Sequence, residues 1–130
     1  MRLYVLILAV SAIVACDRPT TPTTPLNTEF VLAPGDARFV EGTGAEVRFN
    51  SVTNDSRCPA DVFCVTGGDA HVNIRVTSGI GGREYVLHTG DMKPVTHGDL
   101  TIHLVQVVPY PFSSRTISPD EYRVTLRVTR

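Results

Sequence analysis

Short segments in which apolar and polar residues alternate follow one another from residue 29 to the C-terminus. The clearest is 70–77, in which Val72, Ile74 and Val76 share one side and polar residues share the other. A period of two is typical of a strand with one buried face. No window of about eleven or more residues after position 15 shows the helical period of roughly 3.6 residues. The pattern therefore predicts an all-β domain.

About seven strands are expected, at 30–32, 37–41, 46–53, 70–77, 84–88, 100–108 and 122–128. Turn residues separate them, including Pro34-Gly35 and the hairpin glycines of Gly79-Ile80-Gly81-Gly82. In the third strand Val52 is out of phase with the earlier inward positions, and a bulge near Asn50-Ser51 would turn it back to the core. Seven short strands with frequent turns predict an antiparallel immunoglobulin-like β-sandwich.

The first fifteen residues have the pattern of a signal peptide. Arg2 supplies a positive charge, and Leu3 to Val14 is apolar except for Ser11. Twelve helical residues would span about 18 Å, well short of a hydrocarbon core of roughly 30 Å. The segment therefore predicts export and removal rather than a membrane-spanning helix.

The sequence Ile13-Val14-Ala15-Cys16 at the end of this segment resembles the bacterial lipobox. The resemblance implies that Cys16 becomes the mature N-terminus and carries two or three acyl chains such as palmitate. More than one chain makes anchoring to a lipid bilayer stable. An ordinary signal peptide followed by an unrelated cysteine is the alternative. The expected location is the bacterial cell envelope, on a lipid-anchored membrane at its periplasmic or surface face.

Residues 17–28 contain three prolines and five threonines and too few apolar residues to form a core. Such a segment favours polyproline II, which extends by about 3.1 Å per residue and would reach roughly 35 Å. The expected organisation is therefore a signal peptide at 1–15, the lipidated cysteine and a tether at 16–28, and a β-sandwich at 29–130.

Charge and aromatic content exclude some partners. Twelve basic and 13 acidic residues give a net charge of −1, and tryptophan is absent. A chain without a basic surplus has no field to attract nucleic acid, so no nucleic-acid partner is expected.

The cysteine count agrees with export. If lipid occupies Cys16, then Cys58 and Cys64 remain as a pair, and an oxidising envelope favours their disulfide. The bond would close a short loop and stabilise the fold by about 2.4 kcal/mol. A metal site is the alternative, although two thiols at this spacing without a second pair do not match zinc sites.

The string Asp55-Ser56-Arg57-Cys58-Pro59, followed by Cys64 and a Gly-x-Ala strand start, resembles a domain of bacterial lipoproteins and secreted proteins that has no assigned activity. The resemblance covers most of residues 29–130. It implies the fold and the location, and says nothing about a substrate or ligand.

Two roles are open for the residues of this loop. In the first, Arg57 points inward and bridges several loop carbonyls with its five N–H donors, so that the loop serves stability. In the second, the loop is a recognition site that presents Asp55, Arg57 and Asp61 to a partner. Stability is the simpler interpretation for a disulfide-closed loop in a small exported domain.

Tyr122 begins the last predicted strand. Its segment, Ile117 to Tyr122, resembles the tyrosine corner of immunoglobulin-like domains, in which the phenol binds upstream backbone. The spacing is one residue short, and an ordinary inward-facing strand tyrosine is the favoured alternative.

Catalytic and metal chemistry find little support. No two of the four histidines have the helical spacing of a zinc protease, and a site built from separate strands would be invisible in the sequence. Asp69 and His71 are expected to share a strand face and a surface hydrogen bond. No nucleophile motif or phosphate-binding loop is found. We therefore expect no enzyme activity, no cofactor and no metal site.

A non-catalytic envelope module that binds a protein or cell-wall component, or has a structural role, is the function that fits best. The alternative is a cysteine-protease inhibitor, because Gly79-Ile80-Gly81-Gly82 is similar to the Gly-x-Gly-Gly loop of the chagasin group. Pro109-Tyr110-Pro111-Phe112 would stand for that group's aromatic loop. The Asn-Pro-Thr-Thr-Gly loop of the group is missing, apart from Leu26-Asn27-Thr28 in the tether.

Overall fold

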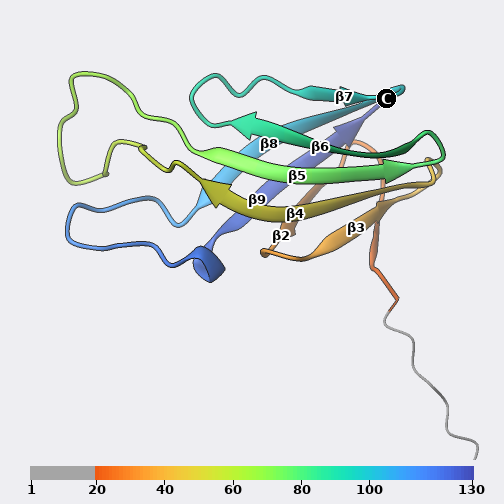
Figure 1. Ribbon diagram of the computed structural model, residues 1–130, viewed down its shortest axis with the longest axis horizontal. Coiled ribbons are helices and arrows are strands. Elements are labelled where there is room, and N and C mark those ends of the chain that lie inside the picture. The colour runs from red at the N-terminus through yellow and green to blue at the C-terminus, as the bar shows by residue number, and fades with distance from the viewer. Residues whose placement is uncertain (1–19) are drawn as a thin grey trace, which may run out of the picture.

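The computed structural model describes residues 20–130, which form two β-sheets packed face to face (Figure 1). The predicted all-β sandwich is confirmed, and residues 20–130 contain nine strands instead of the expected seven. The expected signal peptide at 1–15 and the expected lipid attachment site, Cys16, lie outside the described residues. Among residues 20–130, no helix has the length and hydrophobicity needed to cross a bilayer.

The first sheet has the strand order β1-β3-β4-β5-β6. Its strands are β1 (Thr23–Thr24), β3 (Ala37–Val40), β4 (Ala45–Thr53), β5 (His71–Ser78) and β6 (Gly81–His88). The second sheet has the order β2-β9-β8-β7, with β2 (Glu29–Leu32), β9 (Arg123–Thr129), β8 (Leu100–Val108) and β7 (Val95–His97). A single 3₁₀ turn, η1 (Pro119–Glu121), precedes β9. All strand pairs are antiparallel except β1 with β3.

The core lies between the two sheets and consists of the inward positions of the alternating strands. From the first sheet it takes Val47, Phe49, Val72, Ile74 and Val76, and from the second Ile102, Val124, Leu126 and Val128. All of these side chains are buried. The apolar residues of the sequence pattern therefore form one continuous layer, as expected for sheets that pack about 10 Å apart.

The predicted bulge in β4 is confirmed. The register between β4 and β5 shifts between Phe49 and Ser51, and Val52 packs against the core beyond it. A second shift, between Leu104 and Gln106, occurs where β8 pairs with β9. One extra residue restores the inward direction in each strand because side chains alternate strictly.

The two strands beyond the expected seven are short, and β1 lies inside the segment expected to be a tether. The backbone N–H groups of Phe39 and Glu41 donate to the carbonyls of Pro22 and Thr24, at 3.0 and 2.9 Å. Strands pair through backbone N–H and carbonyl groups, which every residue other than proline carries in full. The polar composition of this segment therefore gave no sign of β1. The first sheet therefore includes Thr23 and Thr24, which precede residue 29, the expected start of the β-sandwich.

The two ends of the sandwich differ (Figure 1). The turns at Gly79-Ile80 and between β7 and β8 meet at one end, which we call the hairpin end. At the other end, called the loop end, segments 54–70, 89–94 and 109–118 project beyond the strands. The three candidate recognition residues, Asp55, Arg57 and Asp61, lie in segment 54–70 at the loop end.

Candidate functional site at the loop end

A disulfide closes part of segment 54–70 at the loop end. Cys58 and Cys64 are bonded, with their Cα atoms 6.0 Å apart, as the cysteine count predicted. Pro59 follows the first cysteine, and the backbone N–H of Ala60 donates to the carbonyl of Pro111 at 2.9 Å. The ring that the disulfide closes, residues 58–64, is therefore hydrogen bonded to segment 109–118.

Arg57 lies inside the protein, with only 8% of its surface exposed. Its guanidinium donates from Nη1 to the carbonyl of Val107 at 2.9 Å and from Nη2 to the carbonyl of Pro109 at 3.0 Å. The predicted inward orientation is thus present, but the carbonyls belong to the end of β8 and the residue after it. Arg57 ties the disulfide loop to the second sheet.

Asp55 is the anionic partner of Arg57. Its carboxylate accepts from Arg57 Nε at 2.8 Å and from Nη2 at 2.7 Å, a bidentate geometry that is among the stronger kinds of charge-assisted hydrogen bond. The same carboxylate accepts from the Tyr122 hydroxyl at 2.8 Å. We refer to Asp55, Arg57 and Tyr122 as the hub, because the three side chains join the loop to β8 and to the start of β9.

The position of Tyr122 decides between the two interpretations of its segment. The side chain faces inward and is buried, as in the favoured interpretation. Its hydroxyl donates to the Asp55 carboxylate, whereas a tyrosine corner requires a bond to upstream backbone. The hydroxyl supplies one of the hydrogen bonds that a partly buried carboxylate requires.

Burial and hydrogen bonding act in opposite directions on the hub carboxylate. Burial raises the pKa of Asp55, but hydrogen bonds from Arg57 and Tyr122 and the positive charge of Arg57 lower the pKa below its ordinary value of 3.8. Burial and the bond to Asp55 together raise the pKa of Tyr122 to about 12. The stabilisation from Asp55 is therefore complete above the unfolded-state pKa near 3.8 and is lost as the pH falls through the lower folded-state value.

Asp61 is exposed and links two loops. Its carboxylate accepts from the backbone N–H of Ser113 at 2.8 Å and also from the Ser113 hydroxyl. Of the three residues proposed for recognition, Asp55 and Arg57 are thus held in the hub and Asp61 is bound to segment 109–118. The interpretation that assigns the loop residues to stability fits this geometry better.

The return segment of the loop passes close to its outgoing segment at Gly68. A Cβ atom at Gly68 would lie 1.5 Å from the carbonyl oxygen of Ser56, so no larger residue fits without moving the backbone. Next to it, the backbone N–H of Ser56 donates to the carbonyl of Asp69 at 2.7 Å. The outgoing and returning segments of the loop therefore lie side by side and are hydrogen bonded just before β5 begins.

The large apolar side chains that are most exposed among residues 20–130 were not recognised from the sequence. Phe63 and Val65 are 98% and 97% exposed, one inside the disulfide ring and one just after it. Val62, Tyr110 and Phe112 are also exposed on the two joined loops. We call these five residues the apolar patch. The signal was an apolar run, Val62-Phe63-Cys64-Val65, in a segment without strand alternation.

The four histidines lie in different surroundings. His71 and His88 meet Asp69 at the loop end. His97 is buried and contacts the Tyr85 hydroxyl and Ser78 Oγ, each at 3.0 Å. A three-residue strand at the sheet edge places it there, and nothing in the local sequence indicated this. His103 contacts Thr129 on the outer face of the second sheet.

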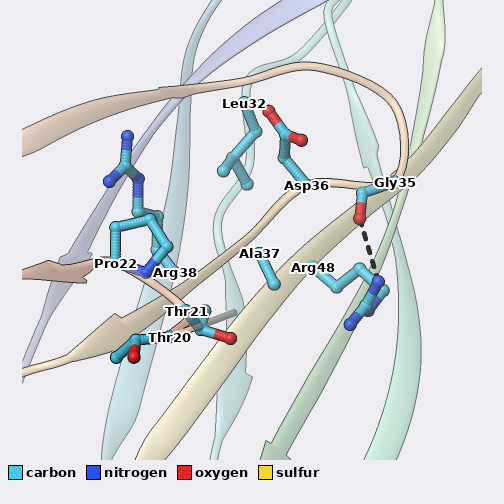
Figure 2. Close-up of a pocket in the computed structure, with 9 residues that line it drawn as sticks. All are labelled: Thr20, Thr21, Pro22, Leu32, Gly35, Asp36, Ala37, Arg38 and Arg48. Carbon is cyan, nitrogen blue, oxygen red and sulfur yellow. Dashed lines mark hydrogen bonds between the residues drawn. The ribbon is translucent and has the colours of Figure 1, made fainter. Parts of the chain in front are cut away.

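Figure 2 shows a hollow beside β3, lined by none of the loop-end segments. Thr20 to Pro22 form one wall, and the turn before β3 and the side chains of Arg38 and Arg48 form others. Arg48 Nη1 donates to the carbonyl of Gly35 at 2.9 Å, and Asp36 accepts from the backbone N–H of Ala33. The Arg48 and Asp36 side chains that line this hollow therefore stabilise the turn between β2 and β3 through hydrogen bonds.

The two segments compared with cysteine-protease inhibitors lie at opposite ends of the sandwich (Figure 1). Gly79-Ile80-Gly81-Gly82 spans the turn at the hairpin end, whereas Pro109-Tyr110-Pro111-Phe112 lies at the loop end. β8 has nine residues and separates the ends by about 26 Å. One protease cleft would not receive both segments from a single direction.

Comparisons with family models, with curated proteins and with solved structures gave no match. The inferences about function therefore rest on the residues and the geometry of this chain.

The hub leads to a prediction about stability. Arg57→Met should lower the free energy of unfolding by about 3–5 kcal/mol, because it leaves the Asp55 carboxylate without its cation. Tyr122→Phe should lower it by about 1.5–3 kcal/mol, since one hydrogen bond to a charged group is lost. Urea unfolding followed by circular dichroism measures both. Arg75→Met, at an exposed ion pair with Glu84, is the control and should cost less than about 0.5 kcal/mol. Equal losses for the two arginine variants would contradict the hub.

Proposed function

We propose that this protein is a bacterial envelope lipoprotein, anchored to a lipid membrane through Cys16, whose loop end binds another envelope protein without catalysing a reaction. The observation that carries the binding role is the nearly complete exposure of Phe63 and Val65 on a loop that is closed by a disulfide and fixed by the hub. The lipid anchor rests on the lipobox resemblance.

The apolar patch fits a protein partner on energetic grounds. Burying large apolar side chains contributes about 1.5–3 kcal/mol each, and aromatic side chains are common among the residues that dominate binding energy. A loop that is already ordered loses little conformational entropy when a partner binds. The disulfide, the hub and the Asp61–Ser113 contact supply that order.

The path of the chain also favours a loop end that faces away from the membrane. The described chain begins on the side of the sandwich away from the loop end (Figure 1). Because β1 is part of the sheet, only six residues separate Cys16 from Thr23, and these seven Cα-to-Cα steps reach at most about 25 Å. In the proposed arrangement the domain lies near the lipid headgroups, and the apolar patch is presented to the aqueous envelope space.

The hub residues do not provide catalytic groups in this proposal. Arg57 is bound to two backbone carbonyls and to Asp55, and the Tyr122 hydroxyl is bound to the same carboxylate. Groups that are buried and already paired have no access to a substrate. A binding or structural module therefore accounts for them better than an enzyme does.

Lipidation is tested by mass spectrometry of the native product from bacterial membranes. The N-terminal peptide should begin at Cys16 and carry the mass of acyl chains on glycerol, and Cys16→Ser should abolish this modification. Cys58 and Cys64 should resist alkylation until a reductant is added. A chain that still begins at an unmodified Met1 would refute the anchor and leave the binding role of the loop end to be judged separately.

The binding role is tested with a photo-crosslinking amino acid at Phe63 in intact cells. We expect one defined protein adduct, and purified chain added in excess should compete for the partner. In the competition assay, the double variant Phe63→Ser/Val65→Ser should be at least about tenfold weaker, because each anchor contributes more than about 1 kcal/mol.

Ile80→Ser is the matched control, because Ile80 is 72% exposed at the hairpin end. It should compete as well as the unaltered chain does. Adducts with lipid alone, or equal adducts from probes at positions 63 and 80, would count against a protein partner at the loop end. Inhibition of papain that depends on Ile80 would support the inhibitor alternative instead.

A further inference from the structure

His71 and His88 are direct neighbours on adjacent strands. The register of β5 and β6 pairs the two residues, and their ring centroids are 4.5 Å apart. Asp69, two residues before His71, places Oδ2 between them, 2.6 Å from Nδ1 of His88 and 3.3 Å from Nε2 of His71. Two strands and the loop before β5 thus bring three donor side chains to one point at the loop end.

The carboxylate of Asp69 is held so that one oxygen is turned to the histidines. Its other oxygen, Oδ1, accepts from the backbone N–H of Gly90 at 2.8 Å and from the Thr89 hydroxyl at 3.2 Å. The Thr89 hydroxyl oxygen in turn accepts from the backbone N–H of Ala70 at 2.9 Å. Contacts of this kind, which orient a ligand from behind, are characteristic of metal-binding carboxylates.

We propose that Asp69, His71 and His88 bind one divalent transition-metal ion of the zinc type, through Asp69 Oδ2 and one ring nitrogen of each histidine. The three donor atoms lie within 4.8 Å of one another. Ligand atoms bonded at about 2.0–2.1 Å to a tetrahedral ion are roughly 3.3 Å apart, so small side-chain rotations suffice. Two imidazoles and one carboxylate select zinc, cobalt, nickel or copper over magnesium and calcium, which prefer oxygen ligands.

The surroundings allow an ion to enter and be oriented. Both histidines and Asp69 are partly exposed, and a groove lined by His88 and Asp91 adjoins them. The Asn54 amide lies 3.3 Å from Nδ1 of His71. A half-turn of this amide would place its oxygen against Nδ1–H and leave Nε2 free for the ion, the usual arrangement of a metal-bound histidine. Three protein ligands leave at least one position for water or for a side chain of a partner.

The test uses the whole chain purified in detergent and stripped with a chelator. Titration with zinc chloride by calorimetry should show one ion per chain with a Kd below about 100 μM, and cobalt should give visible absorption bands of a site with nitrogen and oxygen ligands. Zinc should also raise the Tm, because an ion that binds the folded state stabilises it.

The variants distinguish a metal site from a hydrogen-bonded surface cluster. His88→Gln and Asp69→Asn should each weaken zinc binding at least about tenfold and abolish the shift in Tm. Both sites are at the surface, and far-ultraviolet circular dichroism checks that the variants are folded. His103→Gln, on the outer face of the second sheet, should bind as the unaltered chain does. A Kd above about 100 μM, or the same loss in all three variants, overturns the proposal.

Discussion

The ion pair between Arg57 and Asp55 is the interaction on which the loop end depends. Each partner alone would be costly to bury, and together they are favourable because every charge-bearing oxygen and several guanidinium N–H groups are hydrogen bonded. The pair spans three parts of the fold: the segment before the disulfide, the end of β8 and the start of β9. A small sandwich has limited core area for fixing long loops, and this polar contact does so where hydrophobic packing ends.

The remaining features of the loop end follow from that anchoring. The disulfide restricts the conformations of the loop, and Asp61 binds the loop to segment 109–118, which follows β8. Phe63 and Val65 consequently project from an ordered base instead of folding back onto the sheet. The Asp69–His71–His88 cluster lies on the same end, where the loop enters β5. One end of the molecule thus carries both proposed binding features, and the described chain starts away from it.

The sequence predicts the sandwich well because alternation is a direct consequence of one buried face. It correctly indicated the bulge beside Asn50-Ser51 and the disulfide, which both leave local signals. The strand at Thr23–Thr24 escaped because its pairing relies on backbone groups in a polar segment. The distant partners of Asp55 and Asp69 also escaped, since Tyr122 is 67 residues from Asp55 and His88 is 19 residues from Asp69. Contacts between distant segments depend on which strands lie side by side, and the pattern within one strand does not specify this.

Hydrogen exchange in Asp55→Asn is the most direct test of the claim that the Arg57–Asp55 pair fixes the loop end. The substitution keeps the shape of the side chain and removes its charge. The amides of Ser56 and Ala60, which bind backbone carbonyls within the loop end, should exchange much faster than in the unaltered chain, while the central amides of β4 and β5 keep their protection. If Ser56 and Ala60 remain as protected as before, the loop is ordered without the ion pair and the account is contradicted.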